Sequence, residues 1–201
     1  MCKLTQLEKK FIEVSSDSEK YLSEYTSSVS SVSNEIVISK GALYNLRPYE
    51  IERAGFKKGK KLSKLPKNIK NTHVYHFDVS GCIVLIEIYG QAENIISKEF
   101  CTYGDDFLER LHFTSAGVLR NISVSLFENS ILKKDINWGM YGCSISDYIY
   151  VDSILDKITV HQKEHNDTSF SEFDVILKYQ NEELESITNV FPNGYQEQRY
   201  P

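Results

Sequence analysis

From His73 to the C-terminus the chain repeats one short pattern of hydrophobic residues, and this repetition strongly constrains the fold. In each copy an aromatic residue is followed five or six positions later by Ile or Leu, and three or four positions further by another. Asp, Asn, Ser and Gly recur between the aromatic residue and the first aliphatic one. Strands rich in aromatic and β-branched residues that alternate with short polar turns are typical of a β-hairpin meander. The five copies are Phe77, Ile83 and Ile86; Phe113, Leu119 and Ile122; Phe127, Leu132 and Ile136; Tyr150, Leu155 and Ile158; and Tyr179, Leu184 and Ile187.

The repeat predicts eight to ten strands after residue 70. Nearly every connection is short, so strands adjacent in the sequence are expected to be adjacent and antiparallel in the sheet. The expected strands are residues 73–78, 82–89, 95–102, 107–114, 118–127, 132–138, 145–151, 155–162, 170–179 and 184–190.

The first forty residues have helical periodicity instead. Apolar residues recur every three or four positions from Leu4 to Val14, and this spacing resumes after Ser16 and continues to about residue 33. Ser16 followed by Glu19 predicts a capping box. One face of a large sheet needs cover, so we expect this helix to lie on it, and the other face to be solvated or to be the working surface. The predicted fold class is α+β, a large antiparallel sheet built as a hairpin meander with an N-terminal helix packed against it.

Charge divides the chain into two parts. Residues 1–70 hold 14 Lys and Arg against 8 Asp and Glu, a net charge of +6, whereas residues 71–201 hold 9 against 20, a net charge of −11. We therefore expect an N-terminal helical and Lys-rich segment, 1–70, and a β-meander domain, 71–201. An acidic surface attracts basic partners and repels nucleic acid. The simpler alternative is that the charge only keeps the sheet soluble.

Several absences predict a soluble cytoplasmic protein. The N-terminus has no apolar signal-peptide core. The most apolar run, residues 82–89, is far shorter than the roughly 20 residues needed to span a bilayer. Cys2, Cys82, Cys101 and Cys143 have neither disulfide-like nor metal-ligand spacing, which favours free thiols in a reducing compartment.

Seven lysines lie between Lys57 and Lys70. The glycine spacing before them does not match a phosphate-binding loop, and no Ser or Thr follows the lysine of such a motif. We expect a solvated linker that runs into the sheet, with RNA binding or contact with an acidic partner as the alternatives.

One short motif resembles a catalytic pattern. Residues 161–165 read H-x-x-E-H, which is similar to the inverted zincin motif of certain metalloproteases. On a helix, His161 and His165 would face one metal ion and Glu164 would polarise its water. A helix here would span barely two turns, so we expect a polar hairpin loop. The sequence therefore predicts no catalytic residue, no metal and no cofactor, and a metal-dependent hydrolase is kept as the alternative.

The polar and tyrosine-rich hairpin of residues 75–86 resembles units found around bacterial polymorphic-toxin loci. In the pattern of their hairpins, residues 73–190 resemble the immunity proteins of contact-dependent inhibition and related toxin systems. The resemblance implies a protein that is not an enzyme and that blocks a cognate toxin domain in the cytoplasm of the producing bacterium. It implies a nuclease as the toxin, with an active site that is basic because its substrate is polyanionic. The partner is then a protein, and neither nucleic acid nor a membrane is expected to bind.

Such an inhibitor needs carboxylates where phosphates would lie, together with aromatic side chains that anchor the interface. We expect the partner face to combine residues 103–109 with the strand 147–152 or the turn 182–185. Trp138 is equally compatible with a place in the core. The candidate aromatic residues are Tyr103, Trp138, Tyr141, Tyr148 and Tyr150. The candidate acids are Asp105, Asp106, Glu109, Asp147, Asp152, Glu182, Glu183 and Glu185.

Overall fold

The residues that the structure describes form a single antiparallel sheet of thirteen strands, which confirms the predicted meander. The computed structural model of the chain describes residues 3–92 and 94–201. The strand order is β13-β12-β11-β10-β9-β8-β7-β6-β5-β4-β3-β1-β2, so from β3 onwards each strand pairs with the next one in the sequence. All ten predicted strands are present, with bounds shifted by three residues at most. The strands are β1 (Glu35–Lys40), β2 (Lys60–Leu62), β3 (Thr72–Phe77), β4 (Ile83–Tyr89), β5 (Ile96–Tyr103), β6 (Phe107–Phe113), β7 (Leu119–Glu128), β8 (Ile131–Gly139), β9 (Gly142–Val151), β10 (Ile154–Glu164), β11 (Ser171–Gln180), β12 (Glu183–Val190) and β13 (Gln196–Tyr200).

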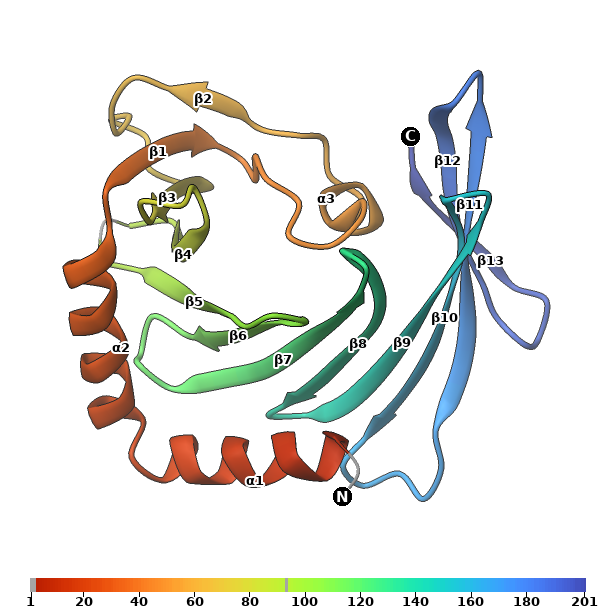
Figure 1. Cartoon of the computed structure of the whole chain (residues 1–201), viewed down its shortest axis with the longest axis horizontal. Helices are drawn as coiled ribbons and strands as arrows, with labels where there is room; N and C mark the ends of the chain where they lie inside the picture. Colours follow the sequence, from red (N-terminus) through yellow and green to blue (C-terminus); the bar gives the residue numbers. More distant parts are fainter. Residues whose placement is uncertain (1–2, 93) are drawn as a thin grey trace.

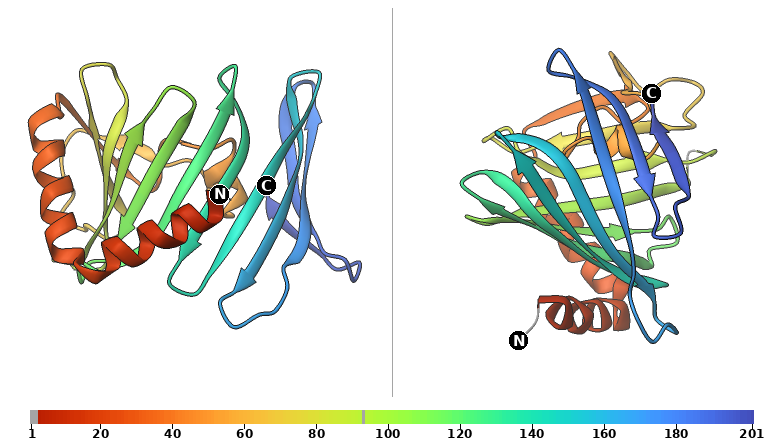
Figure 2. Two further views of the ribbon diagram at one scale, coloured as in Figure 1. Left: turned by 60° about the horizontal axis from the view of Figure 1, so that its bottom comes forward. Right: turned by 90° about the vertical axis from the view of Figure 1, so that its right-hand side faces the viewer.

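Two helices, α1 (Lys3–Ser16) and α2 (Ser18–Val32), cover the convex face of the curved sheet (Figure 1). The apolar sides of the two helices pack against strand residues on the convex face of the sheet, such as Phe100 and Ile122. The predicted capping box at Ser16 is wrong, because the cap of α2 is Asp17, whose side chain accepts a hydrogen bond from the Lys20 amide. Ser16 instead donates its hydroxyl to the carbonyl of Glu13. The chain therefore turns at Asp17, and the single predicted helix is two helices set at an angle (Figure 2).

The concave face is also covered in part, by the chain between β1 and β2. Leu43, Tyr44 and Leu46 pack against a core that includes Tyr75 and Leu108. The segment continues into the short helix α3 (Glu50–Arg53), which lies between the β1–β2 side of the sheet and β13 (Figure 1). The concave face of the sheet is thus neither fully solvated nor fully covered.

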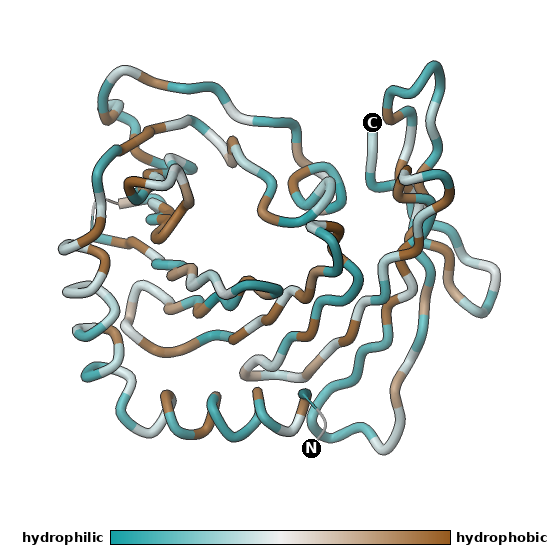
Figure 3. Tube along the Cα trace, in the orientation of Figure 1, coloured by the Kyte–Doolittle hydropathy of each residue, from teal (hydrophilic) through white to brown (hydrophobic). Residues whose placement is uncertain are grey.

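Hydrophobic and polar residues alternate along the central strands, as Figure 3 shows for β7 to β10. Along β10, for example, Leu155, Ile158 and Val160 are buried while Asp156 is exposed. This alternation follows from a sheet whose two faces have different surroundings.

Both ends of the sheet are polar strands that the repeat does not include. β2 lies within the Lys-rich run and pairs with β1, so this part of the expected linker is a short edge strand. β13 pairs with β12 at the opposite edge. β1 and β2 place part of residues 1–70 in the same sheet as the meander. Short, lysine-rich edge strands oppose pairing with other chains.

The cysteines that the structure describes, Cys82, Cys101 and Cys143, are free thiols, whereas Cys2 lies outside the described residues. Within residues 3–92 and 94–201, none of the helices has the length and apolar character that crossing a membrane requires.

Candidate acidic binding site

The hairpin turns gather acidic residues at one end of the sheet. Because the strands alternate in direction, the β3–β4, β5–β6, β7–β8, β9–β10 and β11–β12 turns all lie at the same end, along one border in the left view of Figure 2. These five turns contain five carboxylates and no Lys, Arg or His. At the other end, Asp167 is the one carboxylate among the described residues of the β4–β5, β6–β7, β8–β9, β10–β11 and β12–β13 connections. We call the exposed acids at the first end the acidic rim: Asp105, Asp106, Glu128, Asp152, Glu182 and Glu183.

Three of the turns share one backbone geometry. Asn129 and Ser130 have φ values of 51° and 66°, and Asn181 and Glu182 have values of 50° and 67°. The β9–β10 turn follows the same pattern, with φ of 48° at Asp152 and 67° at the next residue. Two-residue turns with positive φ at both positions match the right-handed twist of paired strands, and Asn and Asp tolerate this conformation well. The turn chemistry that closes the hairpins therefore also places side chains of the acidic rim.

Asp78, in the β3–β4 turn, has a different role. Its Oδ1 accepts hydrogen bonds from the backbone amides of Ser80 and Cys82, each at 2.9 Å. This carboxylate is engaged within its own turn, so we leave it out of the acidic rim.

Tyrosines border the acidic rim on the concave side. Tyr103, which is 41% exposed, lies at the end of β5 on the same face as buried Cys101. Tyr150 and Tyr179 lie near the same end of β9 and β11 and, with Tyr49, line a pocket of about 600 Å³. A second pocket of about 540 Å³ at this end includes Asp105, Asp106 and Glu128, together with Lys3, Lys133 and Lys134.

The structure brings seven of the predicted partner residues to this end of the sheet: Tyr103, Asp105, Asp106, Tyr150, Asp152, Glu182 and Glu183. Glu185 follows on β12 and is exposed.

Other candidates lie elsewhere. Glu109 is on the convex face, where its carboxylate lies 2.5 Å from the Lys10 ammonium of α1. Tyr148 is 5% exposed, and its hydroxyl accepts a hydrogen bond from Arg53 at 2.8 Å, so it belongs to the core. Asp147 pairs with Lys134 at 2.5 Å.

Trp138 and Tyr141 lie toward the opposite end of the sheet. The Trp138 ring packs against the core under the helices, with its centroid 4.9 Å from that of His165. Tyr141 is exposed in the β8–β9 turn. Neither side chain is part of the acidic end.

Tyr49 is a site residue that the sequence did not indicate. Its φ of 53° is in the left-handed region, which is unusual for a bulky residue, and it directly precedes α3. In the sequence the surrounding residues show only a connector and one helical turn. Glu128 was not among the candidate acids either, although the expected bounds place it in the connection after the strand 118–127; in the structure it is the last residue of β7.

A buried ionic network fixes this segment to the sheet. Arg47 lies 2.6 Å from Asp135, which is 4% exposed, and Arg47 also pairs with Glu50. Arg110 of β6 lies 3.0 Å from Glu50, and Ser125 donates a hydrogen bond to Asp135 at 2.6 Å. Burial alone would raise the pKa of Glu50, but the guanidinium groups of Arg110 and Arg47 outweigh it and lower that pKa to about 2. Tyr49, between Arg47 and Glu50, is thereby held in place.

The zincin-like motif lies on a strand, so the helix that would bring both histidines to one metal is not formed. His161 and Glu164 belong to β10, and His165 begins the following connection. His161 lies 3.2 Å from Glu172, whereas the Nε2 of His165 lies 2.8 Å from the carbonyl oxygen of Gly139. Among residues 3–92 and 94–201, no three His, Cys, Asp or Glu side chains are grouped as metal ligands.

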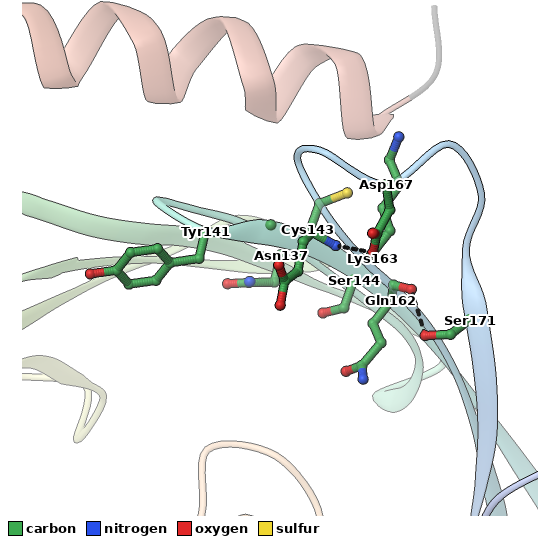
Figure 4. A pocket seen from close by; sticks show the side chains of 10 residues that line it. Asn137, Tyr141, Cys143, Ser144, Gln162, Lys163, Asp167 and Ser171 are labelled. Carbon is green, nitrogen blue, oxygen red and sulfur yellow. Dashed lines mark hydrogen bonds between the residues drawn. The ribbon is translucent and has the colours of Figure 1, made fainter.

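A pocket of about 400 Å³ adjoins this motif, at the ends of β8, β9 and β10 and the start of β11 (Figure 4). Its lining includes Cys143, Ser144 and Lys163. Burial raises the pKa of the Cys143 thiol, and nearby Lys163 only partly opposes this effect. The thiol is therefore protonated at neutral pH, unlike the thiolate that nucleophilic catalysis requires.

Comparisons of the chain with protein-family models, with curated proteins and with solved structures found no match. Function is therefore inferred from the geometry of the site. The acidic rim and its tyrosines form a surface suited to binding a positively charged partner.

Proposed function

We propose that this protein is an immunity protein, which binds a basic toxin domain through the acidic rim and blocks it. The observation that carries the proposal is the gathering of hairpin-turn carboxylates at one end of the sheet, with no basic residue in those five turns. The resemblance of the hairpin units to those of polymorphic-toxin immunity proteins supports the same function.

Electrostatics favours a nuclease as the toxin. A nuclease active site is basic because it binds a polyanion, and a row of carboxylates presents a similar pattern of negative charge. Such complementarity steers the partner and raises the association rate by roughly 10- to 1000-fold.

The tyrosines supply the second requirement of a tight interface. Tyr103 and Tyr150 present apolar rings with polar hydroxyl groups beside the carboxylates. Such residues are enriched among those that dominate binding energy.

The sheet also makes the surface rigid. The rim residues stand on hairpins that are hydrogen-bonded on both sides within a sheet of thirteen strands. Groups that are already ordered lose little conformational entropy on binding, so more of the interaction energy appears as affinity.

The first step of the test is to determine whether a neighbouring gene encodes a toxin, and the second is to purify the protein with the C-terminal domain of that toxin. We expect a 1:1 complex by light scattering, and loss of the toxin's nuclease activity when the complex forms. Tyr103→Ala should speed dissociation about tenfold or more if it is an anchor. A toxin domain that stays active and unbound at micromolar concentrations would contradict the proposal, as would a complex that depends on the lysines of residues 57–70.

A further inference from the structure

The pocket between Tyr49, Tyr150 and Tyr179 has a composition suited to a cation. Its other lining residues include Asn45, Leu155 and Glu182, and none of its lining residues is basic. A polar pocket deeper on the concave face differs sharply, because three arginines line it. The tyrosine pocket thus offers aromatic rings and one carboxylate, and no lysine or arginine is among its lining residues.

We propose that this tyrosine pocket receives a lysine or arginine side chain of the partner protein, with Glu182 at its mouth as the counter-ion. The inference rests on the proposed function, since it assigns one basic residue of the docked partner to a defined place. Aromatic faces attract ammonium and guanidinium groups within about 6 Å of the ring centroid.

The protein already shows this kind of contact at one of the three rings. The Lys133 ammonium lies 5.2 Å from the centroid of the Tyr150 ring. Lys133 lines the neighbouring pocket, not the tyrosine pocket. Burial raises the pKa of Tyr150, and burial together with Tyr49 raises that of Tyr179, so both phenols stay neutral at physiological pH.

The rings are held before any ligand arrives. The Tyr179 hydroxyl donates a hydrogen bond to the carbonyl of Leu155 at 2.8 Å, and its ring centroid lies 6.2 Å from that of Tyr49. The Ile51 amide donates to Asn45 Oδ1 at 2.8 Å, which fixes the loop around Tyr49.

The left-handed backbone of Tyr49 is a second, independent sign of a site. Its φ is 53°, and it makes no side-chain capping hydrogen bond at the start of α3. Bulky residues persist in this conformation only where the surroundings fix them, and such positions cluster at ligand clamps. Tyr49 also lines the pocket, so the residue with the strained backbone is one of those that would contact the ligand.

The first test uses the isolated protein and three small probes. N-acetyl-arginine methylamide and N-acetyl-lysine methylamide supply the cation, and N-acetyl-norleucine methylamide is the neutral control of similar shape. We expect the two cationic probes to shift the NMR signals of the three pocket tyrosines with millimolar affinity. Equal shifts with the norleucine probe, or no shift with either cationic probe, would overturn the proposal.

Variants locate the binding. Tyr150→Leu, Glu182→Gln and Tyr49→Asn should each weaken the cationic probes at least fivefold, and Asn tolerates the left-handed backbone at position 49. Tyr195→Leu is the matched control, because Tyr195 is 60% exposed in the β12–β13 turn and does not line the pocket. Circular dichroism and urea midpoints identify any variant whose loss comes from unfolding. Unchanged probe affinity in all three folded pocket variants would contradict the assignment.

The same variants separate this inference from the proposed function. If the toxin complex forms and dissociates at least tenfold faster in the Tyr150→Leu and Glu182→Gln proteins, both ideas are supported. A complex indifferent to these changes overturns the pocket's role and leaves the proposed function standing. If no toxin complex forms although the small cationic probes still bind, the proposed function is overturned. The toxin is then also excluded as the source of the cation in the pocket.

Discussion

At the scale of single residues, the most sensitive position is Asp135. Its buried carboxylate pairs with Arg47 and accepts a hydrogen bond from Ser125. Removing one member of a buried ion pair leaves the other charge uncompensated, which typically costs about 3 to 5 kcal/mol. Asp135→Asn should therefore lower the free energy of unfolding in urea by about 3 kcal/mol. Asp147→Asn breaks a half-exposed pair with Lys134 and should cost less than about 1 kcal/mol. Equal effects of the two changes would contradict the buried network.

Glu50 gives the same network a pH dependence. Its pKa in the folded protein is about 2, lowered from an ordinary value of 4.5. Because the unfolded chain binds this proton first, the stabilisation is complete above about pH 4.5 and is lost as the pH falls toward 2. The free energy of unfolding should fall over this window, and less steeply in Glu50→Gln. Parallel curves for the two proteins would show that Glu50 is not responsible.

At the scale of elements, the two-residue turns of the acidic rim can be tested with two glycine substitutions that should change the free energy of unfolding in opposite directions. Ser130 has a φ of 66°, a conformation that glycine adopts without strain. Ser130→Gly creates an Asn-Gly turn, which is strongly preferred in such hairpins, and should stabilise the protein by about 0.5 kcal/mol. Ser28→Gly within α2 should destabilise it by a similar amount, because glycine is unfavourable in helices. Urea unfolding of both variants checks the turn assignment.

The elements also show how far the sequence could be interpreted. The ten meander strands were predictable because aromatic and aliphatic residues alternate with turn residues at regular spacing. β13 carries five mostly polar residues, so it has no such pattern and depends on pairing with β12. The place of α3 was not predictable either, since the ion pairs between Arg47 or Glu50 and the sheet join positions more than fifty residues apart.

Site residues divide in the same way. The acids in turns were found because their local sequence fixes both the turn and their exposure. Trp138, Tyr148 and Glu109 were candidate partner residues but lie away from the acidic rim, because which face of a strand is covered depends on the helices and on residues 41–56. No local pattern of the sequence shows that Tyr49 meets Tyr179, because that contact needs the whole sheet to curve around α3.

At the scale of the whole molecule, the net charge of −11 in residues 71–201 matters because part of it is concentrated at one end. A partner approaching from solution experiences the summed field of the rim before any side chain makes contact. The distribution of charge, rather than its total, is therefore what the proposed function requires.

The most direct measurement of this claim is the association rate with the toxin domain at several salt concentrations. Asp105→Lys with Asp106→Lys should slow association at low salt by on the order of tenfold and flatten its salt dependence. Glu19→Lys with Glu24→Lys changes the net charge equally on exposed positions of α2 and is the matched control. We expect a much larger effect for the rim pair than for the helix pair. Equal effects of the two pairs, or none from the rim pair, would contradict docking at the acidic rim.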